Sequence, residues 1–173
     1  YIGTHGMAHS LETIIDSAKI MEKKSINDVT YIFLGDGARK DNLKNYVKEL
    51  GLQNIIFIDT VSREEVVNHW SVLDVSIIHL KNTNAFKSVI PSKLFESMAM
   101  GIPVLHGVLG ESKEIVLENS VGLPFASENS DNLSEKILEL KNNKEKLRIF
   151  SKNGILSSLK YDRHSLALSM LDF

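Results

Sequence analysis

SVIPSKLFESMAMGIPVL, residues 88–105, is the most apolar long stretch of the chain. Its pattern predicts a loop, then a helix over roughly 92–100, then the strand PVLH at 103–106. Lys93 and Glu96 stand inside this apolar stretch, at the point where the loop becomes the helix. A helix that is otherwise apolar therefore begins with an ammonium and a carboxylate, which marks its start as a candidate binding site.

The same alternation of helix and short apolar strand continues on both sides of this stretch. Helical spacing of apolar residues predicts helices over 11–21, 43–50, 66–70, 111–118 and two more at the end of the chain. Apolar runs predict strands at 29–35, 54–58, 74–80, 103–106 and 121–125. The expected helix-end signals are Ser10 and Ser130 as N-caps, Gly51 as a C-terminal cap, and Ser62 with Glu65 as a capping box.

The apolar character of these strands is continuous and does not alternate from residue to residue. Such strands are typical of a parallel sheet that helices cover on both faces. We therefore predict an α/β fold with a doubly wound parallel sheet. The 173 residues, 43% hydrophobic and 24% charged, fit one domain over 1–173.

Composition excludes several kinds of function. The net charge is −2 and the basic residues are dispersed, so we expect no nucleic-acid partner. The chain has no cysteine, which excludes disulfides and metal clusters that need thiolates. No run of about 18 apolar residues and no signal-peptide pattern occurs, so we expect a cytoplasmic location.

The chain opens with YIGTHG, an apolar pair that runs directly into a glycine turn. This pattern is that of the last residues of a strand whose beginning lies further upstream. We therefore expect the sequence to be part of a longer protein.

Ligands of doubly wound sheets bind beyond the carboxyl ends of the strands, where loops lead into helices. The loops at 3–10, 34–40, 59–62 and 81–93 lie at that edge. In the first of them, Gly3 and Gly6 allow phosphates to approach backbone N–H groups, and His5 and His9 lie beside them. Glycine turns after strands are also common for structural reasons alone. That alternative stays open here, and also for Gly35 and Gly37, which lack the spacing of a dinucleotide fingerprint or a P-loop.

The start of the helix at 92–100 carries a more specific indication. Pro91 and Ser92 suit a first helical turn, so the free N–H groups near Ser92, Lys93 and Leu94 form a site for a diphosphate. Lys93 adds a cation, and the two carboxylate oxygens of Glu96 suit the 2'- and 3'-hydroxyls of a ribose. The alternative is that Glu96 only favours a helix start and that Lys93 is solvated.

Signatures of other enzymes are absent from the sequence. No two aspartates stand two residues apart, so the usual carboxylate pair for a nucleotide-bound divalent metal is missing. There is no G-x-S-x-G and no H-E-x-x-H. The six histidines lack zinc spacing, and His69, His79 and His106 stand in apolar surroundings that suit core or wall residues. We therefore expect a site without a metal or other cofactor.

The blocks FLGDG, NIIFIDTVSREEV, PSKLFESMAMGIPV and GESKEIVLENSVGLPF, in this order, resemble a known family. They are similar to the C-terminal, nucleotide-sugar-binding half of GT-B fold glycosyltransferases of the large retaining family 4, which is Rossmann-like. The resemblance covers essentially the whole chain. It implies that the second Glu of the family's Glu-x7-Glu motif is Glu96, which binds the ribose hydroxyls. It also places the diphosphate on the backbone near Ser92 and Lys93 and the base against the loop around Thr60 and Val61. The other expected binding residues of this segment are Val89, Ile90, Pro91 and Leu94.

Two departures from the family pattern concern the donor site. The first Glu of the motif falls on Ser88, and the first loop offers only His5 and His9 between Thr4 and Ser10, where the family usually has an Arg and a Lys. With these changes the chain resembles the subgroup that transfers N-acetylated deoxyamino sugars such as N-acetylfucosamine. The resemblance makes Lys93, Ser88 and His9 the catalytic candidates.

The function that the resemblance implies is transfer of a sugar from a UDP-sugar, with retention, to a glycan or lipid-linked acceptor in bacterial surface polysaccharide synthesis. The expected partners are the nucleotide sugar, the acceptor and an N-terminal domain outside this sequence. That domain is expected to attach the protein peripherally to the inner face of the plasma membrane, and without it the present domain is expected to transfer nothing. The alternatives are a UDP-sugar epimerase of the GT-B fold and a non-enzymatic regulatory α/β binding module. The module would need a strand-end acidic cluster, for which Asp36 and Asp59 are the candidates.

Overall fold

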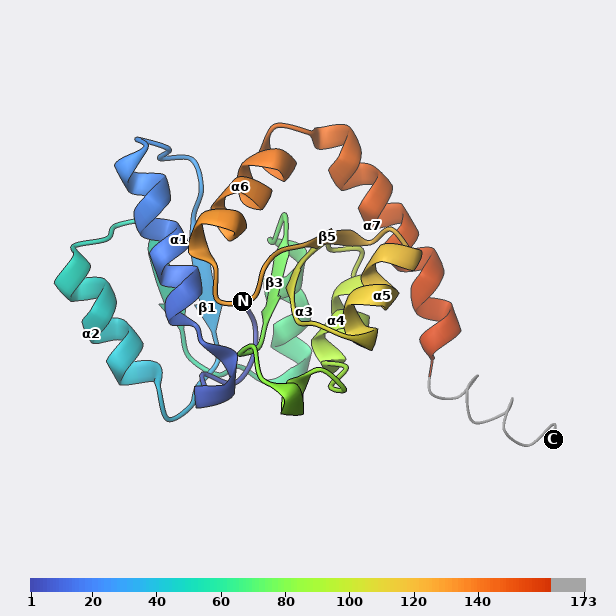
Figure 1. Cartoon of the computed structure of the whole chain (residues 1–173), viewed down its shortest axis with the longest axis horizontal. Helices are drawn as coiled ribbons and strands as arrows, with labels where there is room; N and C mark the ends of the chain where they lie inside the picture. The colour runs from blue at the N-terminus through green and yellow to red at the C-terminus, as the bar shows by residue number, and fades with distance from the viewer. Residues whose placement is uncertain (163–173) are drawn as a thin grey trace.

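The computed structural model describes residues 1–162. Short strands alternate with helices along this part of the chain, as the sequence predicts (Figure 1). The strands are β1 Tyr31–Leu34, β2 Ile55–Ile58, β3 Ser76–His79, β4 Val104–Gly107 and β5 Gly122–Pro124. The α-helices are α1 Glu12–Lys23, α2 Lys40–Leu50, α3 Arg63–Ser71, α4 Ser92–Ala99, α5 Glu111–Glu118, α6 Ser130–Lys141 and α7 Lys144–Ser158. The 3-10 turns are η1 Met7–His9, η2 Asn84–Phe86 and η3 Leu159–Tyr161.

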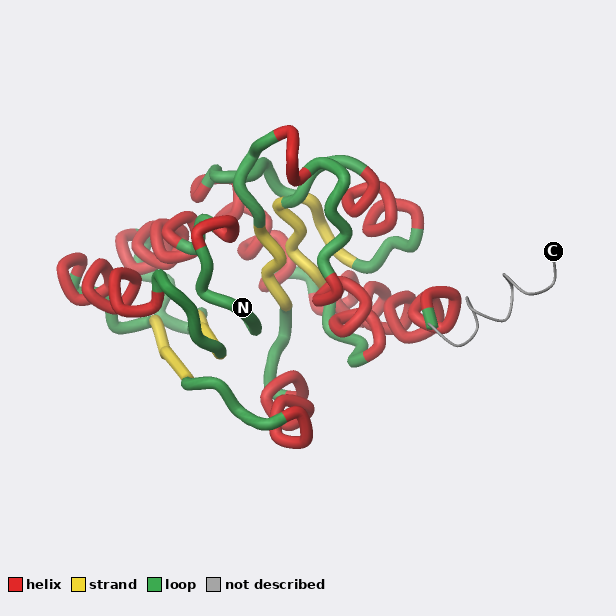
Figure 2. The backbone as a smooth tube through the Cα atoms, turned by 90° about the horizontal axis from the view of Figure 1, so that it is seen from below, coloured by secondary structure: helices red, strands yellow, loops and turns green. Residues whose placement is uncertain are grey.

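All strand pairs in the described residues are parallel, which confirms the predicted α/β class. The strands form two sheets, β1-β2 and β3-β4-β5, and Figure 2 shows them as two separate groups. Ile2 forms a single parallel bridge to Leu34, on the edge of β1 that faces away from β2. The sheet that we expected to be continuous is therefore divided between β1 and β3.

The helix ends follow local sequence signals only in part. Gly51 ends α2 in the left-handed region with φ 68°, and Ser62 and Glu65 form the predicted capping box of α3. Ser10 does not cap α1, because its φ is 43° and its hydroxyl donates to Glu128 instead. Ser130 is also not a cap, since the side chain of the preceding Asn129 accepts the hydrogen bond from the first turn of α6.

Three hydrophobic clusters lie beneath the helices in the described residues, and the smallest consists of Ile2, Leu34 and Trp70. The predicted stripe of α1 is buried and packs with α6 and β1, and its members are Leu11, Ile14, Ile15, Ala18 and Met21. The second core joins β3 and β4 to α4 through Ile78, Val104, Leu94 and Met98. Burial of α4 on this side fixes which of its residues reach the carboxyl edge of the strands.

Candidate functional site

Lys93 joins the start of α4 to the loop that follows Ile2. Its Nζ donates a hydrogen bond of 2.7 Å to the Tyr1 hydroxyl and lies 4.2 Å from the centre of the Tyr1 ring. The end of the Lys93 side chain also lies against Gly3, where a Cβ would overlap it. The Gly3 φ of 136° favours glycine as well, so two observations explain this residue. The structure thus brings Gly3 and Lys93 together, and the Lys93 side chain occupies the space beside Gly3 that a Cβ would need.

The ammonium of Lys93 is half-buried, whereas lysine ammonium groups usually lie in solvent. Burial lowers its pKa to about 8, and the nearby Glu96 carboxylate opposes this shift. Lys93 forms no ion pair with another residue of the described part of the chain. Because a desolvated cation without a carboxylate partner is costly, this position favours an anionic ligand.

The N-terminus of α4 has no side-chain cap. Pro91 occupies the cap position with φ −65° and ψ 129°. The Leu94 N–H donates to the Pro91 carbonyl oxygen at 3.0 Å, and the Leu94 side chain is fully buried. Our prediction that the Leu94 N–H is free was therefore wrong. The N–H groups of Ser92 and Lys93 remain in the first turn, at the positive end of the helix dipole.

Glu96 lies one turn after Ser92 and is exposed. The Ser92 hydroxyl donates to its Oε1 at 3.2 Å. This contact leaves Oε2 of the carboxylate for other donors. The geometry is compatible with the predicted contact to a diol.

His9 lies beside Tyr1 and Lys93, whereas His5 points into the core. The His9 ring is 5.9 Å from the Tyr1 ring, and burial together with the Lys93 charge lowers its pKa. The His5 ring is fully buried between Phe33 and Phe57, and neither ring nitrogen has a hydrogen-bond partner in the described structure. The predicted contact of His5 with a ligand therefore has no support from its side chain, although its backbone belongs to the loop.

The second glycine loop packs under the first. A Cβ on Gly35 would overlap the carbonyl oxygen of Gly3, and one on Gly37 would lie 2.6 Å from that of His5. The buried Lys40 holds this arrangement by donating to the Gly35 carbonyl at 2.7 Å and to Asp59 at 2.6 Å. Close packing accounts for both glycines of the second loop without a ligand.

The two aspartates required by a regulatory module are engaged separately. Asp59 pairs with Lys40, and the Asp36 carboxylate accepts the N–H of Gly37 at 2.7 Å. These contacts give no common acidic cluster.

The remaining predicted residues differ in exposure. Thr4, Thr60, Ser88 and Val89 are exposed at the carboxyl edge of the strands, whereas Val61 and Ile90 pack partly into the hydrophobic cores. Gly6 has φ −102°, and a Cβ there would make only ordinary contacts, so the backbone does not require glycine at this position.

Sequence reasoning missed three residues that organise the site, namely Tyr1, Lys40 and Glu128. Glu128 has φ 58°, and its carboxylate accepts from the Ser10 hydroxyl and from the Asn82 N–H. Its N–H donates to Nε2 of His79 at 2.9 Å. An aromatic side chain just before the first glycine turn could have indicated Tyr1 as a site residue. No local feature of the sequence indicates Glu128 as one.

Three buried histidines give the protein a specific acid sensitivity. His79 and His106 were predicted to lie in the core, whereas His5 was predicted to face a ligand; His69, also predicted for the core, is only partly buried. Burial lowers the pKa of His5 and of His106 to about 4, and it also lowers that of His79. An unfolded histidine has a pKa of about 6.5, so below that pH the unfolded chain binds protons that the folded chain rejects. Stability that is complete above pH 6.5 is therefore lost as the pH falls toward 4.

Urea unfolding between pH 7.5 and pH 5.0 measures this loss. We expect the free energy of unfolding to decrease steadily over this range. Carboxylates contribute mainly below about pH 5, because their ordinary pKa values lie near 4. The loss in this window therefore comes from the histidines and from the amino group of Tyr1, whose pKa burial lowers to about 5. A free energy of unfolding that stays constant from pH 7.5 to 5.0 would contradict the neutral buried state.

Comparison with known proteins gives the family. Residues 1–156 match the family described as glycosyl transferases group 1. The chain belongs to this family. It is 26% identical over 161 residues to the uncharacterized glycosyltransferase MJ1178 of Methanocaldococcus jannaschii. The aligned residues cover 93% of the present chain and 43% of MJ1178. The chain thus spans less than half the length of this curated relative.

Solved structures of glycosyltransferases share the fold. The C-terminal domain of the group 1 family protein LpcC from Francisella tularensis aligns with a TM-score of 0.78 at 22% identity, over 94% of this chain and 84% of that one. A mutant of S. aureus TarM in complex with Fondaparinux, α-GlcNAc-glycerol and UDP aligns with a TM-score of 0.82 at 19% identity, over 99% of this chain and 34% of that one. The fold is that of the C-terminal, Rossmann-like domain of GT-B glycosyltransferases, as predicted.

Two further observations concern residues 1–162. None of their helices is both long enough and apolar enough to span a membrane. They contain no group of three or more His, Cys, Asp or Glu side chains arranged to hold a metal ion. The expectation of a metal-free site stays a prediction.

Proposed function

We propose that this domain binds the nucleotide sugar of a retaining glycosyltransferase, with UDP as the nucleotide. The observation that carries the proposal is the half-buried Lys93 ammonium, which has no ion-pair partner among the described residues and lies beside the uncapped start of α4. Glu96 follows one turn later on the same helix. Membership of the family supports the proposal, as does the UDP in the related TarM complex.

Different residues of the proposed site contact different parts of the nucleotide. The N–H groups of Ser92 and Lys93 and the Lys93 ammonium contact the diphosphate, where the helix dipole also favours negative charge. The Glu96 carboxylate accepts from the ribose hydroxyls, and the loop around Thr60 and Val61 lies against the base. In the transfer step the same N–H groups and ammonium stabilise the negative charge that builds up on the departing diphosphate, without a metal.

Ser88 and its neighbours select the donor sugar in this proposal. Ser88 is exposed in the loop before α4, and a serine is too short to reach the atoms that a glutamate would contact. The exposed Val89 offers an apolar surface for the methyl group of a 6-deoxy sugar. We therefore expect an N-acetyl-6-deoxyhexosamine as the donor sugar, and His9 as a residue near the reacting atoms.

The acceptor side lies outside this chain. We propose that an N-terminal domain completes the cleft, binds a glycan or lipid-linked acceptor and attaches the enzyme peripherally to the inner membrane surface. The role that fits these substrates is synthesis of a surface polysaccharide.

Glu96→Gln tests the ribose contact. We expect UDP affinity to fall by about 1 to 3 kcal/mol, because the variant loses a charged acceptor. The fold should stay intact, since Glu96 is exposed and its recorded hydrogen bond is the one from Ser92. Isothermal titration calorimetry measures the affinity, with Glu118→Gln on the exposed face of α5 as the matched control. Equal UDP affinity for the two variants would show that Glu96 only supports the helix start.

A further inference from the structure

Glu128 lies in the loop between β5 and α6 and adopts a backbone conformation that is rare for a glutamate. Its φ is 58°, in the left-handed region that favours glycine. Ser10, at the end of the first loop, also has a positive φ, of 43°. The two residues are in contact, because the Ser10 hydroxyl donates to Oε1 of Glu128 at 3.2 Å. Such backbone conformations persist where the surrounding contacts hold them.

The Glu128 carboxylate joins two loops that are far apart in the sequence. Oε1 accepts from the Ser10 hydroxyl, and Oε2 accepts from the N–H of Asn82 at 2.9 Å. Ser10 directly follows His9, and Asn82 stands at the start of the loop that leads to Ser88. One side chain thus connects the loop that carries His9 with the loop that carries Ser88.

His79 holds the backbone of Glu128 next to the first loop. The Glu128 N–H can only donate, so Nε2 of His79 accepts from it, at 2.9 Å. Burial lowers the pKa of His79, so the ring is neutral at neutral pH and its proton is on Nδ1. Nδ1 therefore donates to the His9 carbonyl oxygen at 2.8 Å. The imidazole of His79 bridges the backbones of Glu128 and His9.

The loop that carries Ser88 is attached at its two ends. Backbone hydrogen bonds donated by residues 83–89 end on carbonyl oxygens of the same loop, so they shape the loop without attaching it to the strands. Near Ser88, Lys87 packs on Gly110, where a Cβ would overlap the Lys87 carbonyl oxygen. At the other end the Glu128 carboxylate attaches the loop through the N–H that follows Lys81.

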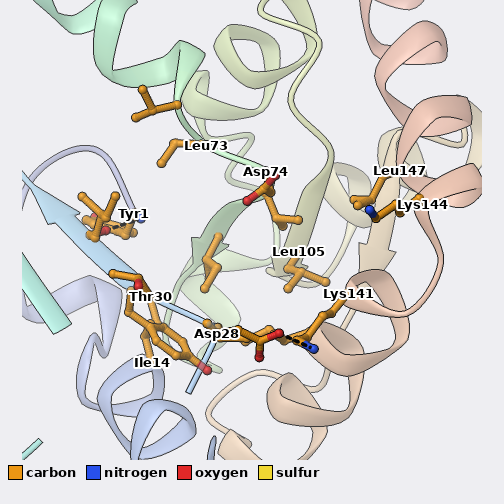
Figure 3. Close-up of a pocket in the computed structure, with 17 residues that line it drawn as sticks. Tyr1, Ile14, Asp28, Thr30, Leu73, Asp74, Leu105, Lys141, Lys144 and Leu147 are labelled. Carbon is orange, nitrogen blue, oxygen red and sulfur yellow. Dashed lines mark hydrogen bonds and ion pairs between the residues drawn. The ribbon is translucent and has the colours of Figure 1, made fainter. Parts of the chain in front are cut away.

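A second exposed carboxylate, Asp28, contacts the opposite end of α6. Asp28 precedes β1 and pairs at 2.8 Å with Lys141, in the last turn of α6 (Figure 3). This ion pair lies beside a cavity between the amino-terminal ends of β1 and β3, whereas the candidate site lies at the carboxyl ends of the strands. Asp28 and Glu128 thus both link distant segments, but at opposite edges of the strands.

We propose that Glu128 is a positioning residue of the donor-sugar pocket. Its carboxylate holds the His9 loop and the Ser88 loop in one arrangement around the sugar, and Glu128 itself does not contact the ligand. The inference rests on the proposed function, which assigns His9 and Ser88 to the sugar. It explains why a glutamate occupies a backbone conformation that favours glycine.

The diphosphate contacts do not depend on Glu128. Nζ of Lys93 donates to the Tyr1 hydroxyl, and the end of the Lys93 side chain lies against Gly3. Neither of these contacts involves Glu128. Loss of the Glu128 carboxylate is therefore expected to weaken binding of the sugar and to spare binding of UDP.

Calorimetric titration with UDP and with UDP-N-acetylfucosamine, a UDP-N-acetyl-6-deoxyhexosamine, tests this separation. In Glu128→Ala, affinity for UDP-N-acetylfucosamine is expected to fall by roughly five- to tenfold and affinity for UDP to stay within about twofold. Glu128→Gly should give the same result, and since glycine tolerates the positive φ it excludes backbone strain as the cause. Glu128→Gln should keep both affinities, because its amide accepts from the Asn82 N–H and donates to Oγ of Ser10.

Asp28→Ala is the matched control, since it also removes an exposed carboxylate that links α6 to a distant segment. It should leave both affinities unchanged. Equal weakening of both ligands by Glu128→Ala would overturn the proposal, because it would show a structural role only. Unchanged binding of UDP-N-acetylfucosamine by Glu128→Ala and Glu128→Gly would overturn it too. If the unaltered protein binds neither ligand, the proposed function itself fails, and the inference fails with it.

Discussion

Lys93→Met is expected to weaken UDP binding by about 10- to 150-fold, which corresponds to the loss of a hydrogen bond from a charged donor. Methionine keeps an unbranched apolar side chain against Gly3 and the Tyr1 ring but lacks the ammonium. The variant should be at least as stable as the original protein in the absence of nucleotide, because it no longer buries an ammonium without an ion-pair partner among the described residues. Calorimetric titration with UDP and a thermal unfolding curve measure the two effects.

Lys48→Met is the matched control for this variant. Lys48 is exposed on α2, so the change removes the same charge from the protein without altering the carboxyl edge of the strands. UDP affinity should then be unchanged within error. If Lys93→Met folds and binds UDP as tightly as Lys48→Met, the ammonium is not part of a phosphate site.

Gly35→Ala is expected to lower the free energy of unfolding by about 3 to 5 kcal/mol. Its φ of 138° is unfavourable for alanine, and the new Cβ would overlap the Gly3 carbonyl oxygen. Because both partners of this contact are backbone, the first and second loops must separate to relieve it. Urea unfolding measures the loss.

Gly51→Ala separates the two causes. Gly51 also has a positive φ, 68°, but no atom lies within 4 Å of a Cβ placed there. This variant should therefore lose only about 1 to 2 kcal/mol, the cost of the left-handed conformation. Equal losses for Gly35→Ala and Gly51→Ala would mean that the loops do not pack as described.

Local rules predicted the features that depend on neighbouring residues. Continuous apolar strands gave the parallel α/β class, and Gly51 and the Ser62–Glu65 pair gave the correct helix ends. The prediction that Ser10 caps a helix was wrong because of a tertiary contact. The Ser10 hydroxyl donates to the carboxylate of Glu128, which lies 118 residues further along the chain. A capping residue can be predicted only where no distant partner competes for its side chain.

The candidate site was predictable at α4 and less so around it. The positions of Ser92, Lys93 and Glu96 follow from the helix start, which is local. The contact of Lys93 with Tyr1 joins residues that are 92 positions apart, and no spacing rule reports it. The burial of the His5 ring between Phe33 and Phe57 and the division into two sheets likewise depend on packing between distant segments.

The position of the Lys93 ammonium bears on the unusual composition of the first loop. The family resemblance led us to expect an Arg and a Lys there, whereas this sequence has His5 and His9. The Lys93 side chain extends from α4 to Gly3 and so brings an ammonium to that same loop. We infer that the cation for the diphosphate comes from α4 in this protein.

Calorimetric titration of the unaltered protein with UDP and, in parallel, with UMP tests the nucleotide site most directly. The proposed diphosphate contacts at Ser92 and Lys93 predict saturable binding of UDP, at least about tenfold tighter than that of UMP. The reason is that UMP lacks the second phosphate group and so loses a hydrogen bond from a charged donor. The affinity should be the same with and without added magnesium, since no metal takes part in the proposed site. A folded protein that does not bind UDP, or that binds UMP equally well, would contradict the assignment of the α4 start as the diphosphate site.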